Sequence, residues 1–231
     1  MTRAQREFGE GPLSRVASFI YTLIVVELML VLASLPGMVA LFLLPRDIRN
    51  IPLVAACAIP FGPALSAAIY ALHHRRSDLT QLRPSSQFWH GYRINVRAVL
   101  PIWLIGLAWL TVVAVTLANF WVSGLPTWWA IVLILIGVLA LLWLTHGLVI
   151  TSLFDFRTLD TIRLAWEMIP RAPVSTLGNA GVIIAAVLVA QVASELLVAV
   201  LAVLFVLALV RTSRPMVELV TTEFTTSNHP E

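Results

Sequence analysis

Residues 128–153 read WWAIVLILIGVLALLWLTHGLVITSL, and this stretch decides what kind of fold the chain can adopt. It contains no Asp, Glu, Lys or Arg. At 1.5 Å per helical residue it is about 39 Å long, whereas the hydrocarbon core of a membrane is about 30 Å thick. Because no water reaches backbone groups inside that core, a helix is the structure expected there. The stretch therefore predicts a membrane-spanning helix.

Four further stretches of the chain have the same apolar character. They run over Val16–Leu44, Ile51–Leu72, Ala98–Val122 and Gly181–Val210. Within all five stretches the only formal charges are Glu27 and Glu195. Apolar residues make up 59% of the 231 residues, above the roughly 45–50% of a soluble domain. The sequence predicts an all-α fold, a polytopic membrane helical bundle with about five transmembrane helices.

The chain is organised around a single membrane domain. We assign 1–15 to an N-terminal tail, 16–210 to the transmembrane domain and 211–231 to a C-terminal tail. The C-terminal tail is rich in Thr and Ser and has no apolar period, so we expect it to be flexible. Cys57 is the only cysteine, which excludes an internal disulfide and a multi-cysteine metal site.

The distribution of arginine predicts how the bundle is oriented. All fifteen basic residues are arginine, and five spans would place eleven of them on one side and four on the other. An excess of positive charge marks the cytoplasmic side. Trp121, Trp128 and Trp129 flank the short 123–127 connection, as expected of an aromatic belt on the outer side. We expect a cytoplasmic N-terminus and an external C-terminus, and this orientation explains the pI of 9.7 without nucleic-acid binding.

Prolines interrupt two of the five stretches. The first contains Pro36-Gly37, and the second contains the run PFGP at 60–63. A proline inside a helix removes a hydrogen bond and clashes with the preceding turn, so both helices are expected to break or kink. One stretch could instead be re-entrant, which would place the C-terminus inside.

Two connecting segments on the expected cytoplasmic side have the pattern of amphipathic helices. In Thr158–Pro170 the apolar residues that recur at helical spacing are Leu159, Ile162, Trp166 and Ile169. In Ser85–Leu100 they are Phe88, Tyr92, Val96 and Val99. Arg163 and Glu167 lie on the opposite side of the first segment at an i,i+4 spacing. We expect two helices lying on the membrane surface, the first capped by Thr158 and ended by Pro170.

Glu27 and Glu195 are the first candidates for a functional role inside the membrane. A carboxylate in hydrocarbon costs a few kcal/mol unless it is protonated or paired, and it often marks an ion or substrate path. Gln191 precedes Glu195 by one helical turn. Beside them runs a stripe of small residues suited to close helix contact, made of Ala186, Ala190 and Ser194. Two interpretations remain open: neutral packing residues, or groups used in transport.

His146 and several surface residues complete the candidate sites. His146 could partner a glutamate or relay protons, and the alternative is an ordinary interhelical hydrogen-bond donor. In the Ser85–Leu100 segment, Trp89, Arg93 and Arg97 could contact lipid head groups or a cytoplasmic partner. In the other segment Arg163 and Trp166 could do the same. For all of these arginines, simple anchoring at the cytoplasmic surface is the alternative.

Patterns typical of enzymes are missing from the sequence. There is no GxSxG, GxxxxGK[ST] or GxGxxG, which are the patterns of serine hydrolases, P-loop enzymes and dinucleotide-binding proteins. His73-His74 has no further Cys, Asp or Glu at ligand spacing beside it. We therefore expect no catalytic activity, no cofactor and no metal site.

Four groups of residues carry a family resemblance. They are Leu35-Pro36, the run FGPALSAAIY at 61–70, the run FWHGYRINVR at 88–97, and Leu153-Phe154-Asp155 with the segment that follows it. Together they resemble the YesL-like family of bacterial integral membrane proteins, a domain of unknown function, over about Ser14–Val210. The resemblance implies a protein of the bacterial cytoplasmic membrane that is often associated with carbohydrate uptake. It implies no reaction and no catalytic residue.

Two functions are therefore expected from the sequence. The first is an accessory component associated with carbohydrate uptake, whose partners are membrane lipids and sugar-transporter subunits. The alternative is a small solute or ion transporter that uses Glu27 and Glu195 within the membrane.

Overall fold

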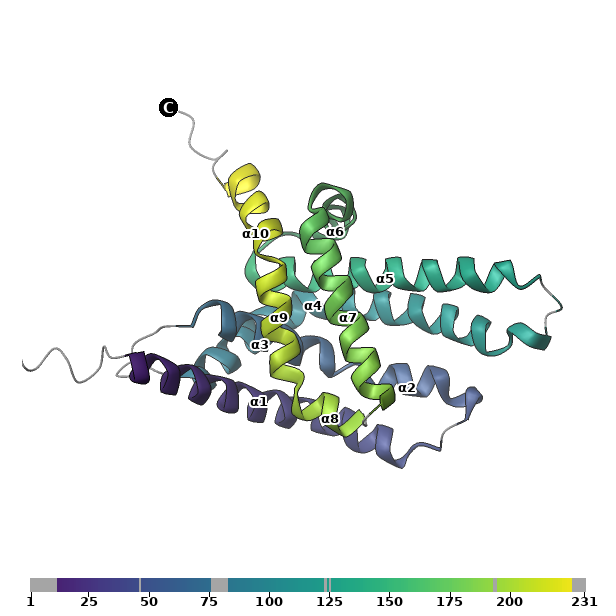
Figure 1. Cartoon of the computed structure of the whole chain (residues 1–231), viewed down its shortest axis with the longest axis horizontal. Helices are drawn as coiled ribbons and strands as arrows, with labels where there is room; N and C mark the ends of the chain where they lie inside the picture. Colours follow the sequence, from purple (N-terminus) through teal and green to yellow (C-terminus); the bar gives the residue numbers. More distant parts are fainter. Residues whose placement is uncertain are drawn as a thin grey trace, which may run out of the picture.

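The computed structural model describes residues 12–45, 47–75, 83–122, 124, 126–192 and 195–225, without the side chains of 12–15, 195–196 and 224–225. Within these ranges the chain is helical and no β-strand occurs (Figure 1). The α-helices are α1 (Pro12–Leu43), α2 (Ile51–Cys57), α3 (Phe61–His73), α4 (Pro84–Ala118), α5 (Trp128–Leu153), α6 (Thr158–Arg171), α7 (Pro173–Val192), α8 (Glu195–Val200), α9 (Ala202–Thr212) and α10 (Arg214–Val220). The described residues also form the 3-10 helices η1 (Ile48–Asn50) and η3 (Phe120–Val122) and a π-helical turn, η4 (Thr221–Thr225).

The predicted all-α membrane bundle is confirmed. Among the described residues, α1, α4, α5 and α7 are long and apolar enough to cross a membrane. A fifth span is possible in which Ile48–Cys57 and α3 act together, with a bend of 43° between them. These are the helices of a multi-pass membrane protein. The quoted stretch forms α5 over its whole length.

The two proline-containing stretches behave differently. The second is broken as predicted, because α2 ends at Cys57 and α3 begins only after Pro60. In the first, α1 continues past Pro36 to Leu43, so the predicted break does not occur there. Gly37 has the Cys57 carbonyl so close that a Cβ could not be accommodated. The glycine next to the proline therefore lets α1 lie directly against the broken helix pair.

Consecutive spans pack as antiparallel neighbours. The Arg75 guanidinium, just after α3, lies 4.5 Å from the ring centre of Phe19 near the start of α1. Trp103 Nε1 of α4 donates to the Ala58 carbonyl at 2.9 Å, close to the start of α3. In the core, α3 presents small residues to its neighbours, and Ala67 and Ala68 are fully buried. Small side chains allow the close helix contact that stabilises membrane bundles.

The two ends of this bundle differ in chemistry. At one end α3 finishes and α4 begins, and we call it the basic end because it carries His73, His74 and Arg75. The opposite end, where α4 connects to α5, carries exposed Trp121, Trp128 and Trp129, and we call it the tryptophan end. In Figure 1 the α4–α5 hairpin extends toward the tryptophan end, on the right.

The segment Ser85–Leu100 is not a separate surface helix. It is continuous with the third apolar stretch as α4, with Pro101 inside the helix. The buried positions Phe88, Asn95 and Val99 recur at helical spacing, and Ile102 continues them after the proline. Pro101 itself is exposed, so its ring and its missing N–H lie away from the packed face. The prediction of a surface helix was wrong here because a proline on the outer face does not end this helix.

The last apolar stretch does not form a single span either. Gly181–Val210 is divided among α7, α8 and α9, and the chain reverses direction between α7 and α9. Met216 N, in α10, donates to Ser175 Oγ near the start of α7 at 3.1 Å. Helices α9 and α10 therefore return to the end where α7 begins, and they lie beside α7 in Figure 1. Helix α10 therefore lies beside the start of α7, and not at the far end of α7 as a straight fifth span predicts.

The segment predicted to be a flexible tail is helical as far as it is described. Helix α9 ends at Thr212, and α10 and η4 continue the chain to Thr225. Arg171, at the end of α6, pairs with Glu223 at 2.9 Å and with Glu167 at 2.8 Å. The ion pair between Arg171 and Glu223 connects η4 to α6. Residues 226–231 lie outside the described part of the chain.

Candidate functional site

Glu27 caps a helix inside the bundle. Its Oε2 accepts a hydrogen bond from Val203 N at 2.6 Å, and Val203 is the second residue of α9. The first amides of a helix have no partner within the helix, and they carry the positive end of its dipole. A carboxylate is the side chain best suited to that position. Glu27 Oε1 is buried and has no hydrogen-bond partner among the described residues.

The candidates of the last apolar stretch lie in the second half of α7 and at the start of α8. Glu195 begins α8, but its side chain lies outside the description. Gln191 is exposed near the end of α7. In the expected small-residue stripe, Ala186 and Ala190 are partly buried, while Ser194 lies outside the described residues. The structure thus brings Glu27 to the start of α9 rather than to Gln191.

His146 lies about two turns before the C-terminal end of α5 and has no solvent exposure. Neither ring nitrogen has a hydrogen-bond partner among the described residues. The expected interhelical hydrogen bond is therefore not formed in this arrangement, and no described carboxylate binds the ring.

A polar cluster that sequence reasoning missed joins α7 to α9. Asn179 Oδ1 accepts from Thr212 Oγ1 at 2.6 Å, and Asn179 Nδ2 donates to Ser213 Oγ at 3.1 Å. Asn179 is fully buried. Hydrogen bonds between helices satisfy polar side chains that would otherwise be unpaired in an apolar surrounding. This cluster stabilises the reversal of the chain.

A second missed cluster joins α3, α4 and α5. Ser152 Oγ lies 2.8 Å from Ser66 Oγ, and Asn95 Nδ2 donates to the Ser152 carbonyl at 3.2 Å. All three side chains are buried. Single Ser and Asn residues within apolar helices are common, and only their meeting in space distinguishes these three. These hydrogen bonds satisfy the polar groups of the three side chains, so a role in packing is enough to explain them.

Helix α6 has one face fixed to the bundle and one face open. Leu164, Ala165 and Met168 are buried, and Trp143 Nε1 of α5 donates to the Ile162 carbonyl at 3.2 Å. On the open face, the apolar residues Leu159 and Trp166 are 57% and 50% exposed. Arg163, predicted on the opposite side of the helix, lies one turn after Leu159 on this same face and is also exposed. The predicted amphipathic helix is therefore present, but half of its predicted apolar stripe faces outward.

Two details of α6 differ from the prediction. The residue at the N-cap is Arg157, whose side chain makes no cap hydrogen bond, and Thr158 is already the first helical residue. Glu167 pairs with Arg171 rather than with Arg163. Both spacings are i,i+4, and the pair with Glu at the N-terminal side is the more favourable of the two orders.

The predicted contact residues of α4 are all at the surface. Trp89, Arg93 and Arg97 are exposed. The Trp89 ring packs edge-on against Tyr92 at 5.5 Å between ring centres. Arg93 and Arg97 are one turn apart, so they share a face of the helix.

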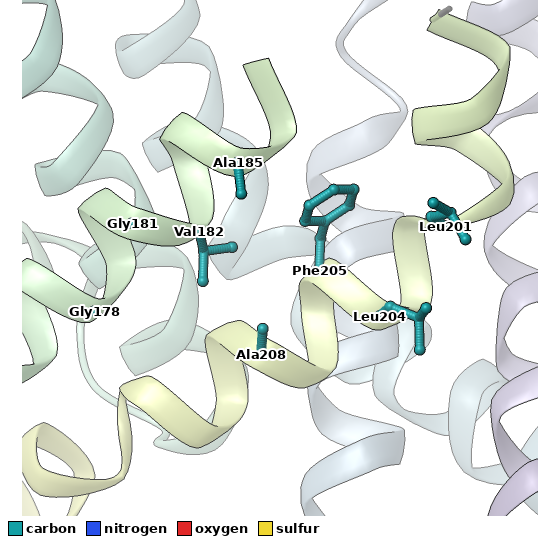
Figure 2. Close-up of a pocket in the computed structure, with 8 residues that line it drawn as sticks. All are labelled: Gly178, Gly181, Val182, Ala185, Leu201, Leu204, Phe205 and Ala208. Carbon is teal, nitrogen blue, oxygen red and sulfur yellow. The ribbon is translucent and has the colours of Figure 1, made fainter. Parts of the chain in front are cut away.

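Figure 2 shows an apolar groove between α7 and α9. Its volume is about 420 Å³. The residues that line it are Gly178, Gly181, Val182, Ala185, Leu201, Leu204, Phe205 and Ala208. None of these side chains is polar, so the groove has the chemistry of an acyl-chain or side-chain contact and not of a reaction centre. Among the described residues, no three His, Cys, Asp or Glu side chains lie together in position to hold a metal ion.

Comparison of the chain with models of protein families, with curated proteins and with solved structures finds no match. The resemblance to the YesL-like family therefore rests on the short motifs quoted above.

Proposed function

We propose that this protein is an accessory component of a solute-uptake system in the bacterial cytoplasmic membrane. Carbohydrate is the class of solute that the YesL-like resemblance implies. The observation that supports this proposal most directly is the form of α6. It is a helix held against the bundle by one face, while its other face presents apolar and basic side chains to a partner.

The open face of α6 has the composition of a contact surface. Trp and Arg are the residues that contribute most to binding at protein interfaces. Here Arg163 and Trp166 stand beside Leu159, all on a helix whose opposite face is buried. The partner we propose is a subunit of a sugar transporter that offers apolar and acidic groups to this face.

The reversal between α7 and α9 supports a cytoplasmic location for the basic end. It moves Arg211 and Arg214 to the side that already holds most arginines in the sequence. The asymmetry is then larger than the eleven against four expected from five simple spans. A stronger excess of arginine favours the placement of this end, and of the N-terminus with it, in the cytoplasm.

Co-purification tests the accessory role. A tagged chain purified in mild detergent should carry sugar-transporter subunits, identified by mass spectrometry. Arg163→Glu, and separately Trp166→Ala, should weaken the binding of these subunits about thirtyfold and so reduce their recovery, since loss of a central interface residue costs about 2 kcal/mol or more. Arg49→Glu makes the same charge change on an exposed side chain in η1, just after the C-terminal end of α1, and should leave recovery unchanged. Recovery of the tagged chain alone, or equal recovery with all three variants, would contradict the proposal.

A second candidate function is transport by the chain itself, and Glu27 is the observation that favours it. Discontinuous helices that point a terminus at a charged group near mid-membrane are typical of transporter binding sites. Glu27 meets the start of α9 in this way, and its second carboxyl oxygen is unpartnered.

Flux measurements separate the two functions. In proteoliposomes, a transporter should move a sugar or protons, and Glu27→Gln should abolish the flux while Arg163→Glu leaves it intact. Absence of flux for the unchanged chain, together with transporter subunits in the pull-down, would leave only the accessory role.

A further inference from the structure

Five basic side chains from three helices converge at the basic end. They are His73, His74 and Arg75 at the end of α3, His90 of α4 and Arg214 at the start of α10. All five are exposed. Arg214 comes near the others because the chain reverses between α7 and α9 and returns to the start of α7.

Ring contacts hold the histidines in a compact arrangement. The Tyr70 ring lies between two of them, with centre-to-centre distances of 4.2 Å to His74 and 5.9 Å to His90. His73 packs edge-on against His74 at 5.2 Å. The backbone of this region is also fixed, since Gln87 Nε2 of α4 donates to the His74 carbonyl at 3.4 Å.

The two arginines come from different parts of the fold, Arg75 beside α1 and Arg214 at the start of α10. The Arg75 guanidinium is held over the ring of Phe19, which leaves the edge of its planar fork free for hydrogen bonds. Arg214 is close enough to His73 to act on it electrostatically, and the other charged group acting on His73 is His74. Arg214 carries a positive charge, and His74 carries one when it is protonated. Within the described part of the chain, the ion pairs are made by Arg171 and not by this cluster.

Two arginines and three imidazole rings that have no anionic partner among the described residues are a suitable site for an anion. Arginine forms paired hydrogen bonds with phosphate, and histidine adds single N–H donors. A metal ion is a poor occupant, because the histidines are not in position to hold one. We propose that the side chains of His73, His74, Arg75, His90 and Arg214 form a binding site for a phosphate group, which we call the phosphate site.

A lipid head group and a soluble phosphate ester offer the same chemistry to this site. The position of the site at the end of a membrane-spanning segment favours the head group of an anionic phospholipid. Basic residues near an anionic membrane surface each contribute about 1 kcal/mol, which corresponds to about fivefold in affinity.

Native mass spectrometry of the full chain in detergent tests the phosphate site. With equal amounts of phosphatidylglycerol and phosphatidylcholine, the unchanged protein should retain phosphatidylglycerol in preference. Arg75→Gln and Arg214→Gln should each lower that retention about fivefold. Arg49→Gln removes the same charge near the far end of α1 and should have no effect. If either variant proves unfolded by circular dichroism, His90→Gln, a change at an exposed ring, should still give a smaller loss.

Addition of glycerol 1-phosphate distinguishes the two sources of phosphate. Displacement of the lipid by millimolar glycerol 1-phosphate would assign the site to a soluble ester, whereas retention would assign it to the lipid. Equal retention of both lipids by the unchanged protein, with no binding of glycerol 1-phosphate, would overturn the proposal. So would retention that responds equally to Arg75→Gln and Arg49→Gln.

Discussion

The carboxyl group of Glu27 stabilises the chain through a single backbone amide. Replacement by Gln removes the charge and keeps an acceptor for Val203 N, whereas Leu removes both. Glu27→Leu should therefore be less stable than Glu27→Gln by about 1 kcal/mol, the usual value of a helix cap. Thermal unfolding of the two variants in one detergent measures the difference, with Gln as the matched control. An unfolding midpoint for Leu equal to or above that of Gln would show that the cap contributes nothing.

Glycine at position 91 is required by the contact between α3 and α4. A Cβ added there would lie 2.8 Å from Tyr70 Cβ, which belongs to the rigid part of that side chain. Gly91→Ala must therefore separate the two helices, and we expect a loss of 1–3 kcal/mol in unfolding free energy, typical of overpacking. At Gly181 a Cβ meets nothing within 4 Å, so Gly181→Ala should gain from the higher helix propensity of Ala. The opposite order of unfolding midpoints would contradict the packing at Gly91.

Individual residues were predictable from the sequence to different degrees. Glu27 and His146 were recognisable because an ionisable group inside an apolar stretch is rare. Asn179 and Ser152 were not, because their importance depends on partners 33 to 86 residues away. Nothing in the local sequence indicates which of many hydroxyl and amide groups will meet across helices.

The reversal of α7 and α9 can be tested by a disulfide. A Cβ built at Gly178 lies 2.7 Å from Thr212 Cβ, and a small shift gives the separation of about 3.8 Å found in disulfides. In a Cys57→Ala background, Gly178→Cys with Thr212→Cys should lose both free thiols on mild oxidation, as counted with a maleimide reagent.

The control for this disulfide uses the same helix. Gly178→Cys with Val192→Cys places two thiols about 21 Å apart along α7, and both should stay reactive. A continuous last span would separate Gly178 from Thr212 by its whole length. In that case both pairs would stay reactive, and the hairpin would be excluded.

Elements were predicted well where apolar length alone decides them and poorly where the direction of the chain changes. Helix α5 matches its stretch because nothing interrupts it. Helix α4 was divided in the prediction into a surface helix and a span, although Pro101, near where the two would meet, lies on the exposed face of one continuous helix. At α4 a proline signalled a boundary that does not exist, whereas the turn before α9 exists without any signal in the sequence. Leu201 is its N-cap, and an apolar residue there carries no sequence signal for a turn, since the capping group comes from Glu27 in another helix.

The whole molecule combines a regular antiparallel bundle with a C-terminal hairpin packed across it (Figure 1). The proposed phosphate site depends directly on this hairpin. It brings Arg214 to the histidines of the phosphate site, and it places η4 beside α6, where Glu223 pairs with Arg171. The position of Arg214 in the phosphate site and the ion pair at the end of α6 are therefore both consequences of the hairpin.

This arrangement predicts that the two termini lie on the same side of the membrane. Helix α1 begins at the basic end, and α10 reaches it through the hairpin. Green fluorescent protein, which fluoresces in the cytoplasm, and alkaline phosphatase, which is active outside it, can each be fused to either terminus of the full chain. The same reporter should be active at both termini, with fluorescence expected if the arginine excess marks the cytoplasm. An active phosphatase at the C-terminus with a fluorescent N-terminus would restore the five simple spans, and it would separate Arg214 from His73 by the thickness of the membrane.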